Sequence, residues 1–190
     1  MQAVDLAAYR EHCRKSVELF GNTTDPIVAN GIAKACLILP SSGTDPAAVA
    51  KMADTAVTRG QTDDMAWFEF CKGLAEYRQG HFSEAAEWTQ KVLSRSEDPH
   101  APVPMFTATG DCPELDLEAY AVLAMARYQM KQTNQARVSL AKGLELADQK
   151  LPKLAIADLG SDWKDWIIGH ALLREAKAPI EGSDASDDTK

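Results

Sequence analysis

The residues that could perform acid–base chemistry or bind a metal are scattered along this chain. Its four histidines are His12, His81, His100 and His170, and none has a partner at the i, i+4 spacing of a metal site on one helix. We therefore interpret them as residues on the surface or at the boundary of helices, with no metal or other cofactor expected.

Paired carboxylates occur three times, as Asp63-Asp64, Glu97-Asp98 and Asp187-Asp188. A catalytic pair needs two carboxylates held across a cleft in unequal environments. Sequence neighbours in exposed loops offer neither condition, so we expect these pairs to be solvated.

Four cysteines are spread widely, at Cys13, Cys36, Cys71 and Cys112, and no CxxC motif occurs. A disulfide framework is not expected in a chain of this kind, and a reducing cytoplasmic location is the default. Cys13 and Cys36 lie on apolar stripes, which predicts buried thiols. Cys71 could face a groove, but a nucleophile would need a nearby base and none is visible.

The clearest structural element is residues 66–93, which read as two helices joined at Gly80. Phe70, Leu74 and Tyr77 fall on one helical face. The second helix repeats apolar residues at helical spacing, namely Phe82, Ala85, Ala86, Val92 and Leu93. Gly80 tolerates the positive φ that a chain reversal needs, so we predict an antiparallel helical hairpin.

A second hairpin is predicted from Tyr120 to Gly143. Tyr120, Leu123 and Ala124 take the first-helix positions, and Ala136 takes the small position of the second helix. Ala85 and Ala136 are 51 residues apart in the sequence (136 − 85). Repeats of fixed pattern predict stacked supersecondary units that bury a shared core.

The composition limits the classes of partner. The chain has 190 residues, 45% of them hydrophobic and 25% charged, as in an ordinary globular domain. Its net charge of −8 argues against a nucleic-acid partner, which needs a basic surface. No apolar run approaches the length of a membrane span, and the N-terminus lacks the apolar segment of a signal peptide.

Helix signals predict about eight helices in an all-α fold. Thr24-Asp25-Pro26 and Thr44-Asp45-Pro46 each combine a capping side chain with proline in the first turn, which predicts two helix starts. Pro179 is expected to end the last helix. The predicted units are hairpins at about 26–59, 64–96 and 115–149, a helix at about 162–178, a Pro-rich insertion at 98–116 and a disordered acidic tail at 181–190.

The hairpin at 66–93 resembles a tetratricopeptide repeat (TPR). Phe70 stands at the tryptophan position of that pattern, Gly73-Leu74 shows its Leu-Gly pair inverted, and Tyr77 takes the tyrosine position. The resemblance implies a right-handed superhelix of antiparallel hairpins within a single domain at residues 1–180, closed by a C-terminal capping helix.

Residues 5–178 also resemble the C-terminal TPR region of planctomycete-type bacterial serine/threonine protein kinases. The stretches TTDPIVANGIAKACLILP and DWKDWIIGHALLREA carry this resemblance most specifically. The chain itself lacks a GxGxxG loop, an HRD-type catalytic loop and a DFG motif, so we do not expect it to be an enzyme. The resemblance implies a non-catalytic accessory region in the cytoplasm that recruits partners or substrates to a kinase.

In a TPR, the inner positions of the first helices contact the ligand. By register these are Cys71, Arg78, Glu118, Ala121, Met125, Tyr128 and Gln129. Their mixed apolar and polar character predicts a protein or peptide ligand held in a groove, or a set of core residues. The alternative function is a structural module that oligomerises through its end helices, where Trp163 and Trp166 either pack inward or contact a partner.

Overall fold

The computed structural model describes residues 5–61, 64–96, 112–150 and 163–182, and all of its regular structure there is helical. The predicted all-α class is therefore confirmed. The described helices are α1 (Leu6–Phe20), α2 (Pro26–Leu37), α3 (Pro46–Arg59), α4 (Met65–Gln79), α5 (Phe82–Ser96), α6 (Pro113–Gln129), α7 (Thr133–Lys150) and α8 (Trp163–Gly182).

The starts of α2 and α3 follow the predicted capping pattern. Asp25 Oδ1 accepts hydrogen bonds from the N–H groups of Ile27 at 2.9 Å and Val28 at 3.2 Å. Asp45 Oδ1 accepts one from the N–H of Ala47 at 3.0 Å. In both helices the next residue is a proline, whose missing N–H costs nothing in the first turn.

The turns of the two hairpins α4–α5 and α6–α7 have the same hydrogen-bond pattern. Gly80 has φ +85°, and the N–H of the next residue, His81, donates to Glu76 O at 3.0 Å. Lys131 has φ +64°, and the N–H of Gln132 donates to Arg127 O at 2.9 Å. Both are helix C-termini closed by a left-handed residue. The two turns are 51 residues apart (131 − 80), as are Ala85 and Ala136.

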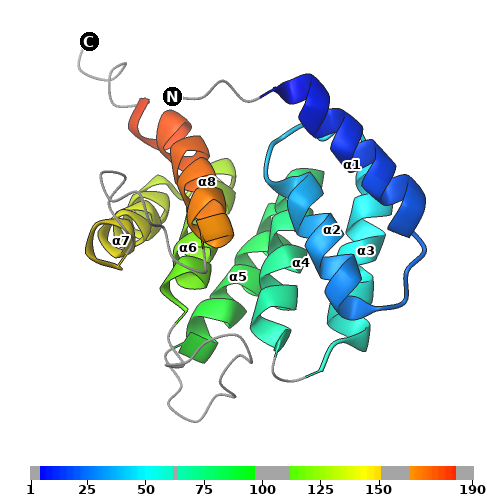
Figure 1. Cartoon of the computed structure of the whole chain (residues 1–190). Helices are drawn as coiled ribbons and strands as arrows, with labels where there is room; N and C mark the ends of the chain where they lie inside the picture. Colours follow the sequence, from blue (N-terminus) through cyan, green and yellow to red (C-terminus); the bar gives the residue numbers. More distant parts are fainter. Residues whose placement is uncertain (1–4, 62–63, 97–111, 151–162, 183–190) are drawn as a thin grey trace.

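The helices form two layers. Each even-numbered helix contacts the next one, in the series α2, α4, α6 and α8. Among the described helices, α3, α5 and α7 make their principal contacts with even-numbered helices and not with one another. Figure 1 shows α1–α3 at one side of the molecule, α6–α8 at the other, and α4 and α5 between them.

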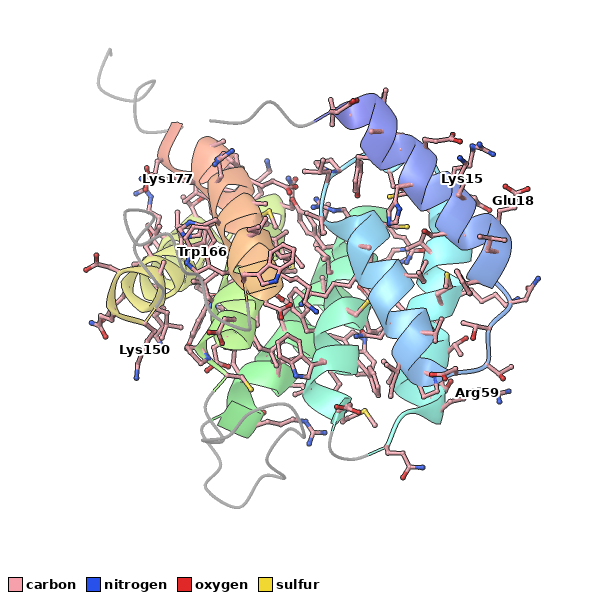
Figure 2. All side chains as sticks on the ribbon, in the orientation of Figure 1. Lys15, Glu18, Arg59, Lys150, Trp166 and Lys177 are labelled. Carbon is pink, nitrogen blue, oxygen red and sulfur yellow. The ribbon has the colours of Figure 1, made fainter. Side chains whose placement is uncertain are left out.

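The core runs continuously between the layers. Its largest fully covered side chains include Phe70, Leu74 and Met52, whereas Tyr77 is half-buried against it. The four cysteines are free and buried, as predicted for Cys13 and Cys36. Figure 2 shows side chains filling the space between neighbouring ribbons, with charged residues such as Lys15 and Glu18 at the periphery.

The structure corrects three boundaries. Pro179 does not end the last helix: α8 continues to Gly182, because Ile180 is buried and holds the final turn against the core. Glu181 therefore belongs to a helix and lies 3.4 Å from Lys177. The predicted insertion at 98–116 ends earlier, since α6 begins at Pro113. The described part of the chain does not include residues 97–111, 151–162 and 183–190. The rest of the predicted insertion and the rest of the predicted tail fall within these ranges.

Candidate functional site

Two clusters of charged side chains lie where the even-numbered helices face one another. We define the inner face as the side of α2, α4 and α6 that carries Lys34, Trp67, Arg78 and Glu118. Lys34 and Arg78 are its cations, and both have carboxylate partners on α8. The inner face therefore joins helices that lie far apart in the sequence.

The Lys34 cluster brings together three helices. Lys34 Nζ of α2 lies 2.9 Å from Glu118 Oε2 of α6 and 2.6 Å from Asp165 Oδ1 of α8. The same nitrogen lies 4.6 Å from the ring centroid of Trp67 and 5.3 Å from that of Phe70, both on α4. A cation in this position is stabilised by two carboxylates and by the negative faces of two aromatic rings.

Burial determines the protonation of this cluster. Burial raises the pKa of Glu118 to about 8, although nearby Lys34 lowers it, and Asp165 raises it further. Burial alone would lower the pKa of Lys34, but Glu118 and Asp165 outweigh that effect and the pKa is raised. At neutral pH the raised pKa keeps Lys34 charged, and burial favours the protonated form of Glu118. A charged lysine has no lone pair for nucleophilic attack, so this arrangement favours electrostatic attachment.

The Arg78 cluster joins the C-terminal ends of α2 and α4 to α8. Arg78 Nε donates to Leu37 O at 2.9 Å, and Nη2 donates to Ile38 O at 3.1 Å and to Glu175 Oε2 at 2.8 Å. The guanidinium thereby satisfies carbonyls at the C-terminal end of α2, which have no partner within their own helix. It also makes a second contact with Glu175 through Nη1, so the pair is held by two contacts.

Other buried charges are paired within neighbouring helices of the stack. Glu69 of α4 is fully buried and accepts from Arg95 Nε at 2.7 Å, with Lys91 Nζ 2.8 Å from its other oxygen. Lys72 of α4 lies 2.5 Å from Asp54 of α3. These pairs stabilise adjacent helices. The inner face differs, because its two cations are paired with carboxylates of α8, at the end of the described helices.

The structure places the seven predicted groove residues unevenly. Cys71, Ala121, Met125 and Glu118 are buried, and the side chain of Arg78 is nearly so. Tyr128 is half-buried and Gln129 is exposed. Gln129 lies near Tyr77, whose pKa is raised by burial and by nearby Glu175. Arg78 and Gln129 therefore meet around Tyr77 and Glu175, and Glu118 faces Lys34. Their binding of a ligand remains a prediction.

The candidates for acid–base chemistry have separate surroundings, and one of them, Cys71, lies near Lys34 and Glu118. His81 Nδ1 lies 2.6 Å from Glu76 Oε2 at the α4–α5 turn, where its side chain is 55% exposed. His170 packs against Trp166, with ring centroids 4.2 Å apart, and burial lowers its pKa. Asp64 is buried, contrary to the expected solvated pair, because it lies at the start of α4 against the core. Burial raises the pKa of the Cys71 thiol to about 12, which disfavours a thiolate.

Within the described ranges, His, Cys, Asp and Glu form no group of three or more that could hold a metal ion. None of the described helices combines the length and the hydrophobicity needed to cross a membrane. Comparisons of the chain with protein-family models, curated proteins and solved structures found no match. The resemblance to TPR regions of kinases therefore stays a prediction.

Sequence reasoning missed Lys34, Asp165 and Glu175 as members of the site. One signal was present: Lys34 is the only charged residue of α2, whose sequence is PIVANGIAKACL. A single charge among apolar residues of a packed helix has to find a partner or remain at the surface. The signal could not identify that partner, because Asp165 is 131 residues away in the chain.

Proposed function

We propose that this chain is a non-catalytic scaffold that binds a protein or peptide on its inner face. The observation that carries the proposal is that Lys34 and Arg78 of the inner face already hold a helix, α8, through Asp165 and Glu175. A surface whose cations pair with carboxylates of a separate helix has the chemistry for helix-in-groove recognition.

The arrangement of helices supports a TPR-like right-handed superhelix as the scaffold. Its support is the two-layered contact pattern and the identical turns at Gly80 and Lys131. In the role that the resemblance implies, the chain would be an accessory region in the cytoplasm that recruits partners to a bacterial serine/threonine kinase. A stack of repeats provides the extended concave surface that such recruitment uses.

The test is a selection of peptides from a displayed library against the full chain, followed by affinity measurement with purified peptides. We expect Tyr128→Ala to weaken the selected peptides by about tenfold, because Tyr128 is the half-buried aromatic at the predicted groove. The matched control is Val138→Ala on α7, an exposed apolar residue outside the even-numbered layer. Equal affinity of both variants, or no selected peptide at all, would contradict the proposal.

One observation favours the alternative, a structural module that oligomerises through its ends. Trp163 and Ile167 lie four residues apart on α8 and are 50% and 46% exposed, whereas Trp166 is buried. Sedimentation of the full chain over a hundredfold range of concentration distinguishes the two functions. An association that Trp163→Ser abolishes would favour the structural module over the peptide scaffold.

A further inference from the structure

Helix α1 is attached to the rest of the stack through a small part of its surface. Among its residues, only Cys13 and Ser16 are buried. Its apolar residues Leu6, Leu19 and Phe20 are 47%, 75% and 45% exposed. Figure 1 shows α1 at the edge of the molecule, where its principal contacts within the described part of the chain are with α2. A helix that buries few side chains opens locally at a lower free energy than the helices of the core.

The contact between α1 and α2 brings two cysteines together. Cys13 of α1 and Cys36 of α2 are 0% and 2% exposed. The thiol of Cys36 donates a weak hydrogen bond to Cys13 O, with 3.9 Å between the sulfur and the oxygen. Tyr9, one turn before Cys13, places its hydroxyl 3.0 Å from Cys36 O, to which it donates. These contacts hold the two cysteines beside each other.

A third cysteine lies deeper in the core. Cys71 of α4 is fully buried, and its thiol donates to Asn30 O at 3.8 Å. Burial raises the pKa of the Cys36 thiol to about 12, and nearby Cys13 contributes more to this rise than Cys71 does. Cys36 therefore has two neighbouring cysteines, of which Cys13 belongs to the helix that opens more easily.

The closed interface between α1 and α2 protects these thiols from oxidation. The nucleophile in thiol–disulfide exchange is the thiolate, and a thiol with a pKa of about 12 forms very little thiolate at neutral pH. When α1 opens, water reaches Cys13 and Cys36, and the burial that raises the pKa of Cys36 is removed. Reaction with a small oxidant is therefore confined to the opened form of α1.

We propose that Cys13 and Cys36 are a thiol pair which a low-molecular-weight disulfide oxidises, and that the resulting protein disulfide locks α1 onto α2. One of the two thiolates attacks the small disulfide, which gives a mixed disulfide and releases one small thiolate. The other cysteine then attacks the mixed disulfide and releases the second. Two protein thiols are thus oxidised to one disulfide, and the small disulfide is reduced to two thiols that take up the two protons. This inference goes beyond the proposed function and does not depend on it.

The disulfide changes the opening equilibrium of α1. It connects positions 23 residues apart in the chain (36 − 13), one on each of the two helices. A covalent link of this kind removes the extended conformations of the opened form, so it favours the docked form. In the reduced chain α1 opens and closes, whereas in the oxidised chain it stays on α2 and covers that end of the stack.

The test uses the folded full chain and oxidised glutathione at pH 8 without denaturant. Free thiols are blocked with iodoacetamide, and peptide mapping by mass spectrometry identifies which cysteines are joined. The variants Cys13→Ala and Cys36→Ala each remove one member of the pair. The matched control is Cys71→Ala, which removes the buried cysteine of α4. Because the map of the unmodified chain already identifies the pairing, the answer does not depend on the folding of any variant.

We expect a Cys13–Cys36 disulfide as the main product in the unmodified chain and in Cys71→Ala, and its absence in the other two variants. Hydrogen exchange of α1 amides should then be at least tenfold slower in the oxidised chain than in the reduced chain, with α4 and α5 unchanged. A Cys36–Cys71 disulfide, a mixed disulfide that does not proceed further, or no reaction would overturn the inference. A mixture of all pairings would show that the globally unfolded chain reacts, and equal exchange of α1 in both forms would show that nothing is locked. Either result would overturn it as well.

Discussion

Replacing Lys34 by methionine is expected to lower the free energy of unfolding by about 3 kcal/mol at neutral pH. Methionine keeps an unbranched side chain over the rings of Trp67 and Phe70 but removes the charge. Asp165, 2.6 Å from Lys34 Nζ, then remains a largely covered carboxylate without its cation. Removing one partner of a buried ion pair is costly because the other charge stays desolvated. Urea denaturation of both proteins measures the difference.

The matched control is Lys15→Met on α1, where the lysine side chain is 64% exposed and pairs with Glu11. Its expected effect is below about 0.5 kcal/mol, as is usual for exposed pairs. Adding Asp165→Asn and Glu118→Gln to Lys34→Met should restore at least half of the lost stability, because no buried charge is then left unpaired. A loss below about 1 kcal/mol for Lys34→Met alone would contradict this description of the cluster.

The second large effect concerns pH. Glu118 has a pKa of about 8 in the folded chain, above its ordinary 4.5, because it is buried. The folded state therefore holds this proton more strongly than the unfolded state does. The resulting stability is fully present below pH 4.5 and is lost as the pH rises through 8. The glutamine of Glu118→Gln cannot titrate. The free energy of unfolding of this variant, relative to that of the unmodified chain, should therefore rise by roughly 2 to 3 kcal/mol between pH 6 and pH 9.

The difference in unfolding free energy between Glu118→Gln and the unmodified chain isolates the contribution of Glu118 from those of other titrating groups. The groups that act on it are Lys34 of α2, Asp165 of α8 and Glu114 of α6, and they are present in both proteins. The exposed control is Glu11→Gln on α1. Hydrogen bonds from Arg14 and Lys15 lower the pKa of Glu11, so the difference should not depend on pH in this range. Denaturation curves at pH 6, 7, 8 and 9 measure the effect. A constant difference between Glu118→Gln and the unmodified chain would show that Glu118 is already ionised at neutral pH.

Features set by a few neighbouring residues could be predicted from the sequence. Asp25 and Asp45 cap helices by accepting hydrogen bonds from N–H groups in the first turn that follows them. Gly80 adopts a left-handed conformation that its lack of a Cβ permits. The turn at Lys131 was harder to anticipate, because a lysine there has to tolerate a positive φ. The end of α8 was predicted wrongly, since burial of Ile180 outweighs the local preference against proline.

The candidate site was predictable only in part. Helical periodicity fixes the side of a helix on which a residue lies, and the structure places Glu118 against Lys34 and Arg78 against Glu175. Whether these two residues contact a ligand stays a prediction. Periodicity could not indicate that α8 covers the even-numbered layer, since this depends on contacts between residues such as Arg78 and Glu175, which are 97 positions apart. Periodicity contains no information on such distant pairs. Cys71, Ala121 and Met125 were predicted to be either groove or core residues, and they are buried.

The measurement that tests the central claim most directly is a double-mutant cycle between Arg78 and Glu175. The claim is that α8 is attached to the inner face through its carboxylates. The cycle compares the unmodified chain with Arg78→Met, Glu175→Gln and the double variant by urea denaturation. We predict a coupling energy of at least about 1 kcal/mol, as expected for a partly buried pair held by two contacts. A coupling below about 0.3 kcal/mol would show that the two residues act independently and would contradict the account.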